Sequence, residues 1–177
     1  MKATLIFLLM LFSTSFASAQ KIVVNNTDKF TGSKLIETSV LKTSRPNVDY
    51  RMRNINDTLY LCAATKGLKI DVDENTRSKI YIITVNGVHV NLDGVIQDSR
   101  VEEYHSGVHW GYGISTGTTT HLTDVELFFL IPRESFSMLC TDKISDIRIS
   151  IGNENLDYEV DEFIAKKFLK LFNLLKE

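Results

Sequence analysis

The sequence has no excess of either charge, no internal repeats and no low-complexity tracts. Its 20 Lys and Arg stand against 22 Asp and Glu, and neither sign forms a long block. A surface that binds nucleic acid needs a clustered basic excess, so nucleic acid is not expected as a partner. The chain length of 177 residues suits one domain with a sizeable core, even without the N-terminal segment described next.

Long apolar runs are also missing, with one exception at the start of the chain. Ala3–Phe12 follows the positive charge of Lys2 and precedes the small residues Ala17-Ser18-Ala19. This arrangement is typical of a signal peptide at 1–19. The run falls short of the ~20 residues that span a bilayer. We therefore expect export to the periplasm or the medium, a single domain over 20–177 and no transmembrane segment after signal removal.

Cysteine is scarce, since Cys62 and Cys140 are the only two. In an exported chain they could form one disulfide, which would close a loop of about 80 residues and contribute on the order of 4 kcal/mol. Each also sits among apolar neighbours, as a small buried core residue would. Both alternatives, a Cys62–Cys140 disulfide and two buried thiols, stay open.

The remaining residues alternate in the manner of antiparallel strands. In Val48–Arg53, apolar Val48, Tyr50 and Met52 share one face and charged residues occupy the other. The clearest turn signal is Asn86-Gly87 between two strand-like runs, which predicts a two-residue hairpin turn because both central residues need positive φ. A second strand pair is expected on either side of Gly152-Asn153.

Near the C-terminus the period changes to that of a helix. From Asp161 onward, Ile164, Phe168, Leu171 and Leu175 line one side, with polar residues opposite. The pattern predicts an amphipathic helix over 161–176, capped by Asp161. The fold class expected is mainly β (α+β), either an antiparallel β-sandwich or an open barrel-like sheet, closed by this helix.

The string GISTG at 113–117 matches the G-x-S-x-G pattern of a serine nucleophile elbow. An elbow needs a helix directly after the serine, and the histidine last in chain order. Ser115 is followed by a Gly- and Thr-rich run that disfavours a helix. No histidine lies beyond His121. We therefore assign no catalytic residue.

Two weaker motifs concern metal ions. His105 and His109 are weak candidates for metal ligands, but on a strand such residues stand about 13 Å apart. Asp71–Asn75 resembles the start of a calcium loop, although Thr76 replaces its glycine and Ile82 its final acid. Neither motif is sufficient, so we expect no metal and no cofactor.

Three aromatic residues gather in the same Gly-rich stretch. Tyr104, Trp110 and Tyr112 could offer flat apolar surface for a ligand or a protein, or they could pack inward under a loop. Irregular segments between strands commonly carry binding residues. These three side chains are therefore the candidate binding site.

The C-terminal third, FFLIPRESFSMLCTDKISDIRISIGNENLDYEVDEFIAKKFLKLFNLL, and the early segment DKFTGSKLIETS resemble a group of small exported β-rich proteins of the Bacteroidetes type. The shared features are a strand, a short turn or helix, a strand pair and a helix with the pattern Ala165–Phe168. The resemblance covers about half the mature chain. It implies the fold and the export, and it implies no activity.

The sequence favours an exported, non-catalytic binding or interaction module of the cell envelope or medium, whose partner is an unidentified protein or small ligand. The alternative is a carrier of a small ligand or lipid in a barrel-like interior, which would need an apolar cavity. A hydrolase is the weaker third hypothesis. It would need titratable groups such as Glu102, Glu103 and the histidines to be brought together by the fold.

Overall fold

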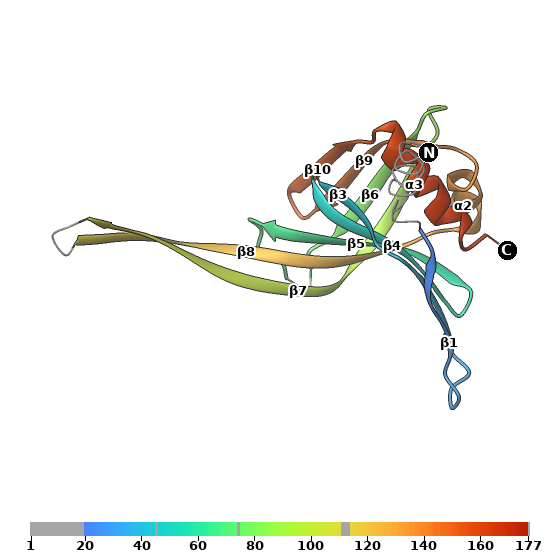
Figure 1. The fold of residues 1–177 in the computed structure, drawn as a ribbon, viewed down its shortest axis with the longest axis horizontal. Coiled ribbons are helices and arrows are strands. Elements are labelled where there is room, and N and C mark those ends of the chain that lie inside the picture. The colour runs from blue at the N-terminus through green and yellow to red at the C-terminus, as the bar shows by residue number, and fades with distance from the viewer. Residues whose placement is uncertain (1–19, 45, 74, 111–113, 177) are drawn as a thin grey trace, which may run out of the picture.

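The structure, a computed structural model, describes residues 20–44, 46–73, 75–110 and 114–176; for 106–110 and 114–118 it describes the backbone alone. The expected signal peptide at 1–19 and the candidate Tyr112 lie outside the described residues. Within the described residues, all the strands belong to one sheet, to which two helices are added (Figure 1).

The sheet is open, antiparallel and 10-stranded, in the order β1-β2-β4-β5-β8-β7-β6-β9-β10, with β3 beside β4. This confirms the expected fold class and selects the open sheet over the sandwich. The strands are β1 (Ile22–Thr27), β2 (Lys34–Thr38), β3 (Leu41–Ser44), β4 (Asn47–Ile55), β5 (Thr58–Leu68), β6 (Ser78–Thr84), β7 (His89–Trp110), β8 (Ile114–Leu130), β9 (Ile144–Ile151) and β10 (Glu154–Glu159).

Alternation along the strands decides which face of the sheet forms the core. In β4, Val48, Tyr50 and Met52 are fully buried, as the sequence predicts. In β8, Leu127 and Phe129 are buried in the same way. The opposite face of the sheet carries most of the charged side chains. Because strand side chains point alternately to the two faces, the core lies on one side only.

The two helices cover the core face. They are α2 (Arg133–Leu139) and the C-terminal α3 (Glu162–Asn173). The helix ends at Asn173 rather than at the predicted residue 176. Asp161 is the N-cap, and its carboxylate accepts a hydrogen bond from the Ile164 N–H at 2.8 Å. The α3 helix packs against β3, β4 and β9. Since β4 and β9 lie near opposite ends of the strand order, the sheet must curve around the helix.

Phe168 is the centre of this packing. Its ring is fully buried, meets the Tyr50 ring edge-on with 5.0 Å between centroids, and stacks on Phe172. Burial of such a side chain contributes about 1.5–3 kcal/mol. The side chains of α3 therefore fill the space between the two ends of the curved sheet.

The hairpin predicted at Asn86-Gly87 joins β6 to β7, but its turn differs from the prediction. Gly87 has a φ of 79°, whereas Asn86 does not have positive φ. The Gly87 N–H donates to the Thr84 carbonyl at 2.9 Å, so the loop is one residue longer, as in a type I turn followed by a left-handed glycine. The turn with two positive φ values is at Asn56-Asp57, between β4 and β5.

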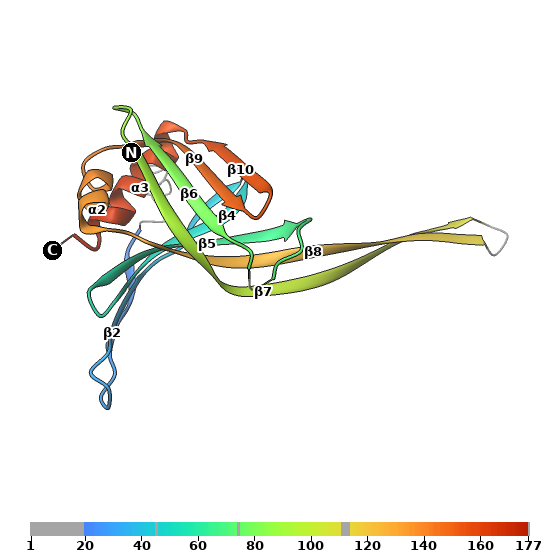
Figure 2. The ribbon, with the colours of Figure 1, turned by 180° about the vertical axis from the view of Figure 1, so that it is seen from behind.

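Strands β7 and β8, of 22 and 17 residues, extend far beyond the rest of the molecule (Figure 1). Seen from behind, the same two strands still form a lone ribbon, while the β1–β2 hairpin forms a shorter projection in another direction (Figure 2). Mean strands are about 5–6 residues long, so these are exceptional. The described parts of the Gly-rich stretch, up to Trp110 and from Ile114, are thus strand rather than loop.

Candidate functional site

The projecting ribbon begins where its neighbouring strands end. The last pair between β5 and β8 is Leu68 with Thr123, and β6 pairs with β7 as far as Gly94. Further out, among the described strands, β7 and β8 pair only with each other, up to Trp110 and Ile114. We call Glu102–Trp110 together with Ile114–Leu122 the arm. At about 3.3 Å per residue it projects ~30 Å.

The base of the arm is held by side chains from the adjoining segments. The Thr123 hydroxyl donates to the Ile70 carbonyl at 2.6 Å, and the Asp124 carboxylate accepts from the Gly67 N–H at 2.8 Å. Gly94 lies under the Phe129 ring, where an added Cβ would come within 2.4 Å of that ring. These contacts fix the arm's direction relative to the body, which we define as the described residues outside the arm.

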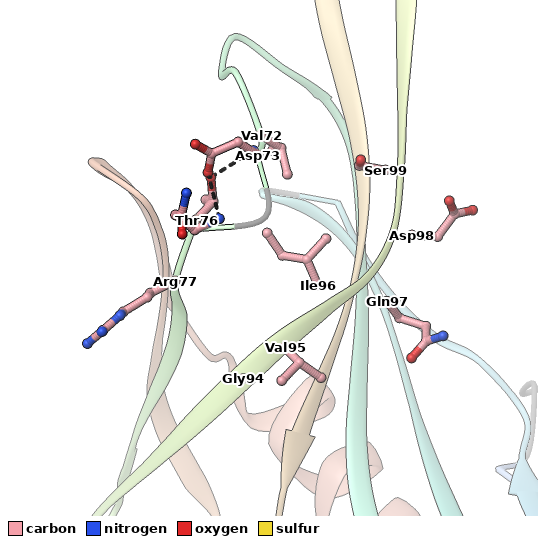
Figure 3. A pocket seen from close by; sticks show the side chains of 11 residues that line it. Val72, Asp73, Thr76, Arg77, Gly94, Val95, Ile96, Gln97, Asp98 and Ser99 are labelled. Carbon is pink, nitrogen blue, oxygen red and sulfur yellow. Dashed lines mark hydrogen bonds between the residues drawn. The ribbon is translucent and has the colours of Figure 1, made fainter.

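A hollow of about 800 Å³ lies beside the arm base, between the loop that precedes β6 and the segment Gly94–Ser99 of β7. Its carboxylate Asp73 accepts hydrogen bonds from the Thr76 hydroxyl at 2.6 Å and the Asn75 N–H at 3.0 Å (Figure 3). The Thr76 hydrogen bond holds the pKa of Asp73 below its usual value. The carboxylate therefore stabilises its own turn.

Near the base of the arm, one carboxylate lies between two histidines. Glu103 is 3.8 Å from His105 and, across the ribbon, 3.6 Å from His121. His105 also contacts the Thr119 hydroxyl at 3.0 Å. All these side chains are exposed, and exposed ion pairs contribute little. The structure thus brings His121 rather than His109 to the pair formed by Glu103 and His105.

The two histidines named as weak metal candidates, His105 and His109, both lie in strand β7, about 13 Å apart along it. Among the described residues, no group of three or more His, Cys, Asp or Glu side chains is arranged to hold a metal ion. Ser115 lies inside β8, with more strand after it rather than the helix of a nucleophile elbow.

The two candidate aromatic residues that the structure describes, Tyr104 and Trp110, lie apart. Tyr104 is 53% exposed and its hydroxyl donates to Glu102 at 2.8 Å, which raises the pKa of the phenol. Trp110 lies at the far end of β7, opposite Ile114. Six residues of strand separate Tyr104 from Trp110, or about 20 Å. The aromatic hypothesis therefore reduces to separate positions along the arm.

The two cysteines are free in the structure, so the disulfide alternative is not realised. Cys62 lies in β5 opposite Arg51, on the face of the sheet away from the helices, and Cys140 lies at the end of α2 in the core. The sheet thus separates the two thiols. Burial raises the pKa of Cys62 to about 12, although Arg53 and Arg51 act in the opposite direction. Burial also raises the pKa of Cys140.

Charged groups on the outer face of the sheet are matched within the protein. Arg51 pairs with Glu37 at 3.4 Å and with Glu126, and Arg53 pairs with Glu37 at 2.5 Å. Arg53 also lies over the Phe128 ring, 4.9 Å from its centroid. With two cations facing two anions, this network presents no net charge to an ionic ligand.

A second hollow of about 750 Å³ lies over β6, β9 and β10 on the same outer face. Arg148 and Asp157 form a two-point ion pair across it, at 2.5 and 2.8 Å. Ser150 donates to Asn155 at 2.5 Å. These four polar side chains therefore bond to each other, as Asp73 and Thr76 do in the first hollow.

Phe30, at the end of the β1–β2 hairpin, is a surface residue that the sequence analysis did not single out. It is 97% exposed. The Asp28 carboxylate accepts from the N–H groups of Phe30 and Thr31 at 2.8 and 2.7 Å, which lowers the pKa of Asp28. A lone aromatic residue in the turn pattern Asp-Lys-Phe-Thr-Gly is the sequence signal that could have indicated it.

No protein-family model, curated protein or solved structure matches this chain. Within residues 20–176, apart from the gaps, no helix is both long enough and apolar enough to cross a membrane. The role of the arm is therefore inferred from its geometry.

Proposed function

We propose that the protein is an exported, non-catalytic interaction module of the cell envelope or medium, and that the arm is the element that contacts its partner. One observation carries this proposal: β7 and β8 continue as a two-stranded ribbon beyond the end of β5. A two-stranded hairpin alone is marginally stable in water, and its edges offer unpaired backbone groups to another strand.

The distribution of paired groups supports the same proposal. In both hollows and in the Arg51–Glu126 network, the charged groups Asp73, Arg148 and Arg51 are bonded within the protein, so these groups are already occupied. The core face of the sheet is filled by α3, whose Phe168 and Phe172 occupy the position that a carried ligand would need. These arrangements favour contact through the arm over catalysis or transport.

The proposal is tested by photo-crosslinking in cells that produce the protein. A photoreactive residue at exposed Thr119 of the arm should give a defined crosslinked species, because the arm lies against its partner. The matched control is Lys42 of β3, whose side chain is 77% exposed on the body. Crosslinks from Lys42 but not from Thr119 would contradict the proposal.

A shortened arm provides the second test. Glu102 and Leu122 face each other in the register, so Glu103–His121 can be replaced by Asn-Gly to give a two-residue hairpin. We expect the shortened protein to unfold at the same denaturant midpoint as the full chain. A photoreactive residue on the body next to the arm base should crosslink to the partner in the full chain but not in the shortened protein. Loss of folding instead would show that the arm belongs to the core.

A further inference from the structure

The two edges of the arm differ in their residue types. On the β7 side, the edge Glu102–Trp110 carries the charged residues Glu102 and Glu103. On the β8 side the free edge is Ile114–Leu122, written ISTGTTTHL, which contains no Asp, Glu, Lys, Arg or Pro. Charged residues and prolines are the usual means by which proteins keep edge strands from pairing. The β8 edge lacks both and is rich in β-branched Thr.

The β8 edge is also bounded at both ends. Toward the body, Thr123 is already paired with Leu68 of β5, so an added strand must stop at Leu122. Toward the end of the arm, the strand begins at Ile114. An added strand would lie on the same side of β8 as β5 and would pair with the whole of Ile114–Leu122. The centre of this stretch is Thr118.

We infer that the occupant of this edge is the same edge of a second copy of the chain, antiparallel to the first, with Thr118 on the two-fold axis. The inference rests on the proposed function, because it takes the arm to be the contact element. Two identical edges that pair over their whole free length must meet in this register. A two-fold interface uses the same surface patch on both copies.

The residue types agree with this register. It pairs Ile114 of one copy with Leu122 of the other, Ser115 with His121, and Thr116 with Thr120. In this register apolar residue types lie opposite apolar ones, Ser and Thr lie opposite polar ones, and no like charges are opposite each other. Cross-strand Thr pairs are among the favourable ones, and like charges directly opposite are unfavourable. Pairing through the β7 edge would instead bring its acidic residues into the interface.

The test uses a charge exchange at Thr118 in the purified full chain, followed by sedimentation over a range of concentrations. We expect the wild-type chain to dimerise. Thr118→Lys and Thr118→Glu should each dimerise at least about fivefold more weakly than the wild-type chain, because each places like charges directly opposite one another. An equimolar mixture of the two variants should recover the dimer, since Lys then faces Glu. Only a self-paired position gives this rescue.

The matched controls are His105→Lys and His105→Glu on β7, where the side chain is 71% exposed. They should leave the dimer intact. A wild-type chain that stays monomeric at high concentration, or variants that dimerise as the wild type does, would overturn the inference, as would a mixture without rescue. A monomer that still crosslinks to another protein from Thr119 overturns this inference alone. Absence of any crosslink from Thr119 overturns the proposed function itself.

Discussion

The body and the arm are built from the same antiparallel pairing but are stabilised differently. In the body, α3 buries Phe168 against Tyr50, and each central strand has a neighbour on both sides. In the arm, β7 and β8 have only each other among the described strands, and no helix covers them. Backbone pairing is therefore sufficient to shape a two-stranded ribbon. A sheet that is stable without a partner also needs the burial of apolar side chains.

The difference is clearest on the two sides of Thr123. Toward the body, β8 carries Val125, Leu127 and Phe129 into the core; toward the arm, Thr119 and His121 are exposed. One strand thus passes from a region that contributes to the core into a region that is paired on one side only. Changes in the body and at the junction should therefore alter stability, whereas the order of the arm is tested separately, at the end.

Removal of the central aromatic ring should have the largest effect. Phe168→Ala leaves a cavity between α3 and β4, so we expect the free energy of unfolding to fall by about 3–5 kcal/mol. Denaturant unfolding measures this. The matched control on the same helix is Phe163→Ala, whose side chain is 62% exposed and should cost under about 1 kcal/mol. Equal losses for the two variants would contradict the assignment of the core face.

At the junction, Gly94→Ala should cost about 1–3 kcal/mol of unfolding free energy, because the new methyl group would lie 2.4 Å from the Phe129 ring and 2.6 Å from the Ser78 hydroxyl. Thermal unfolding and amide exchange in β6 and β7 would report it. Gly87→Ala meets no atom within 4 Å, but its φ of 79° should cost about 1 kcal/mol. A Gly94→Ala protein as stable as the wild type would show that the junction is loosely packed.

A further effect on stability is expected at alkaline pH only. Burial raises the pKa of Cys62 to about 12 from its ordinary value of 9.0, so folding favours the protonated thiol. The resulting stability is intact below pH 9, where the thiol is protonated in both states. It falls by up to about 1.4 kcal/mol per pH unit between 9 and 12 as the unfolded state loses its proton. Burial raises the pKa of Tyr50 in the same direction.

The contributions of the two groups can be separated by substitution. Cys62→Ala should flatten the alkaline slope of unfolding free energy from pH 9, whereas Tyr50→Phe should flatten it only from about pH 10. An alkaline slope unchanged by Cys62→Ala would show that the thiol is solvated. The wild-type protein should titrate two free thiols when unfolded, with or without reductant, since both cysteines are unpaired.

Regular patterns in the sequence were enough to predict the body. The period of 3.6 residues and the cap at Asp161 predicted α3, and the alternation of Val48, Tyr50 and Met52 predicted the buried face of β4. Local chemistry was less decisive for the turns. Asn86-Gly87 predicted the hairpin correctly, but β6 and β7 are joined by a loop that is one residue longer than the predicted turn.

The arm could not be predicted in the same way, because no apolar stripe identifies a strand that buries neither face. Glycines at 107, 111, 113 and 117 suggested a loop, whereas the Thr-rich run from Thr116 to Thr120 favours strand. The free edge of β8 depends on where β5 ends, at Leu68, which is a property of the topology. For the same reason, only the fold could bring His121 to Glu103.

The most direct test of the central claim, that the body is stable alone and the arm is ordered by a second copy, is amide hydrogen exchange at low and high protein concentration. We expect exchange across Ile114–Leu122 to slow markedly as the concentration rises, while β5, β6 and β9 remain protected at every concentration. Protection of Ile114–Leu122 that is strong at low concentration and unchanged at high concentration would contradict the claim.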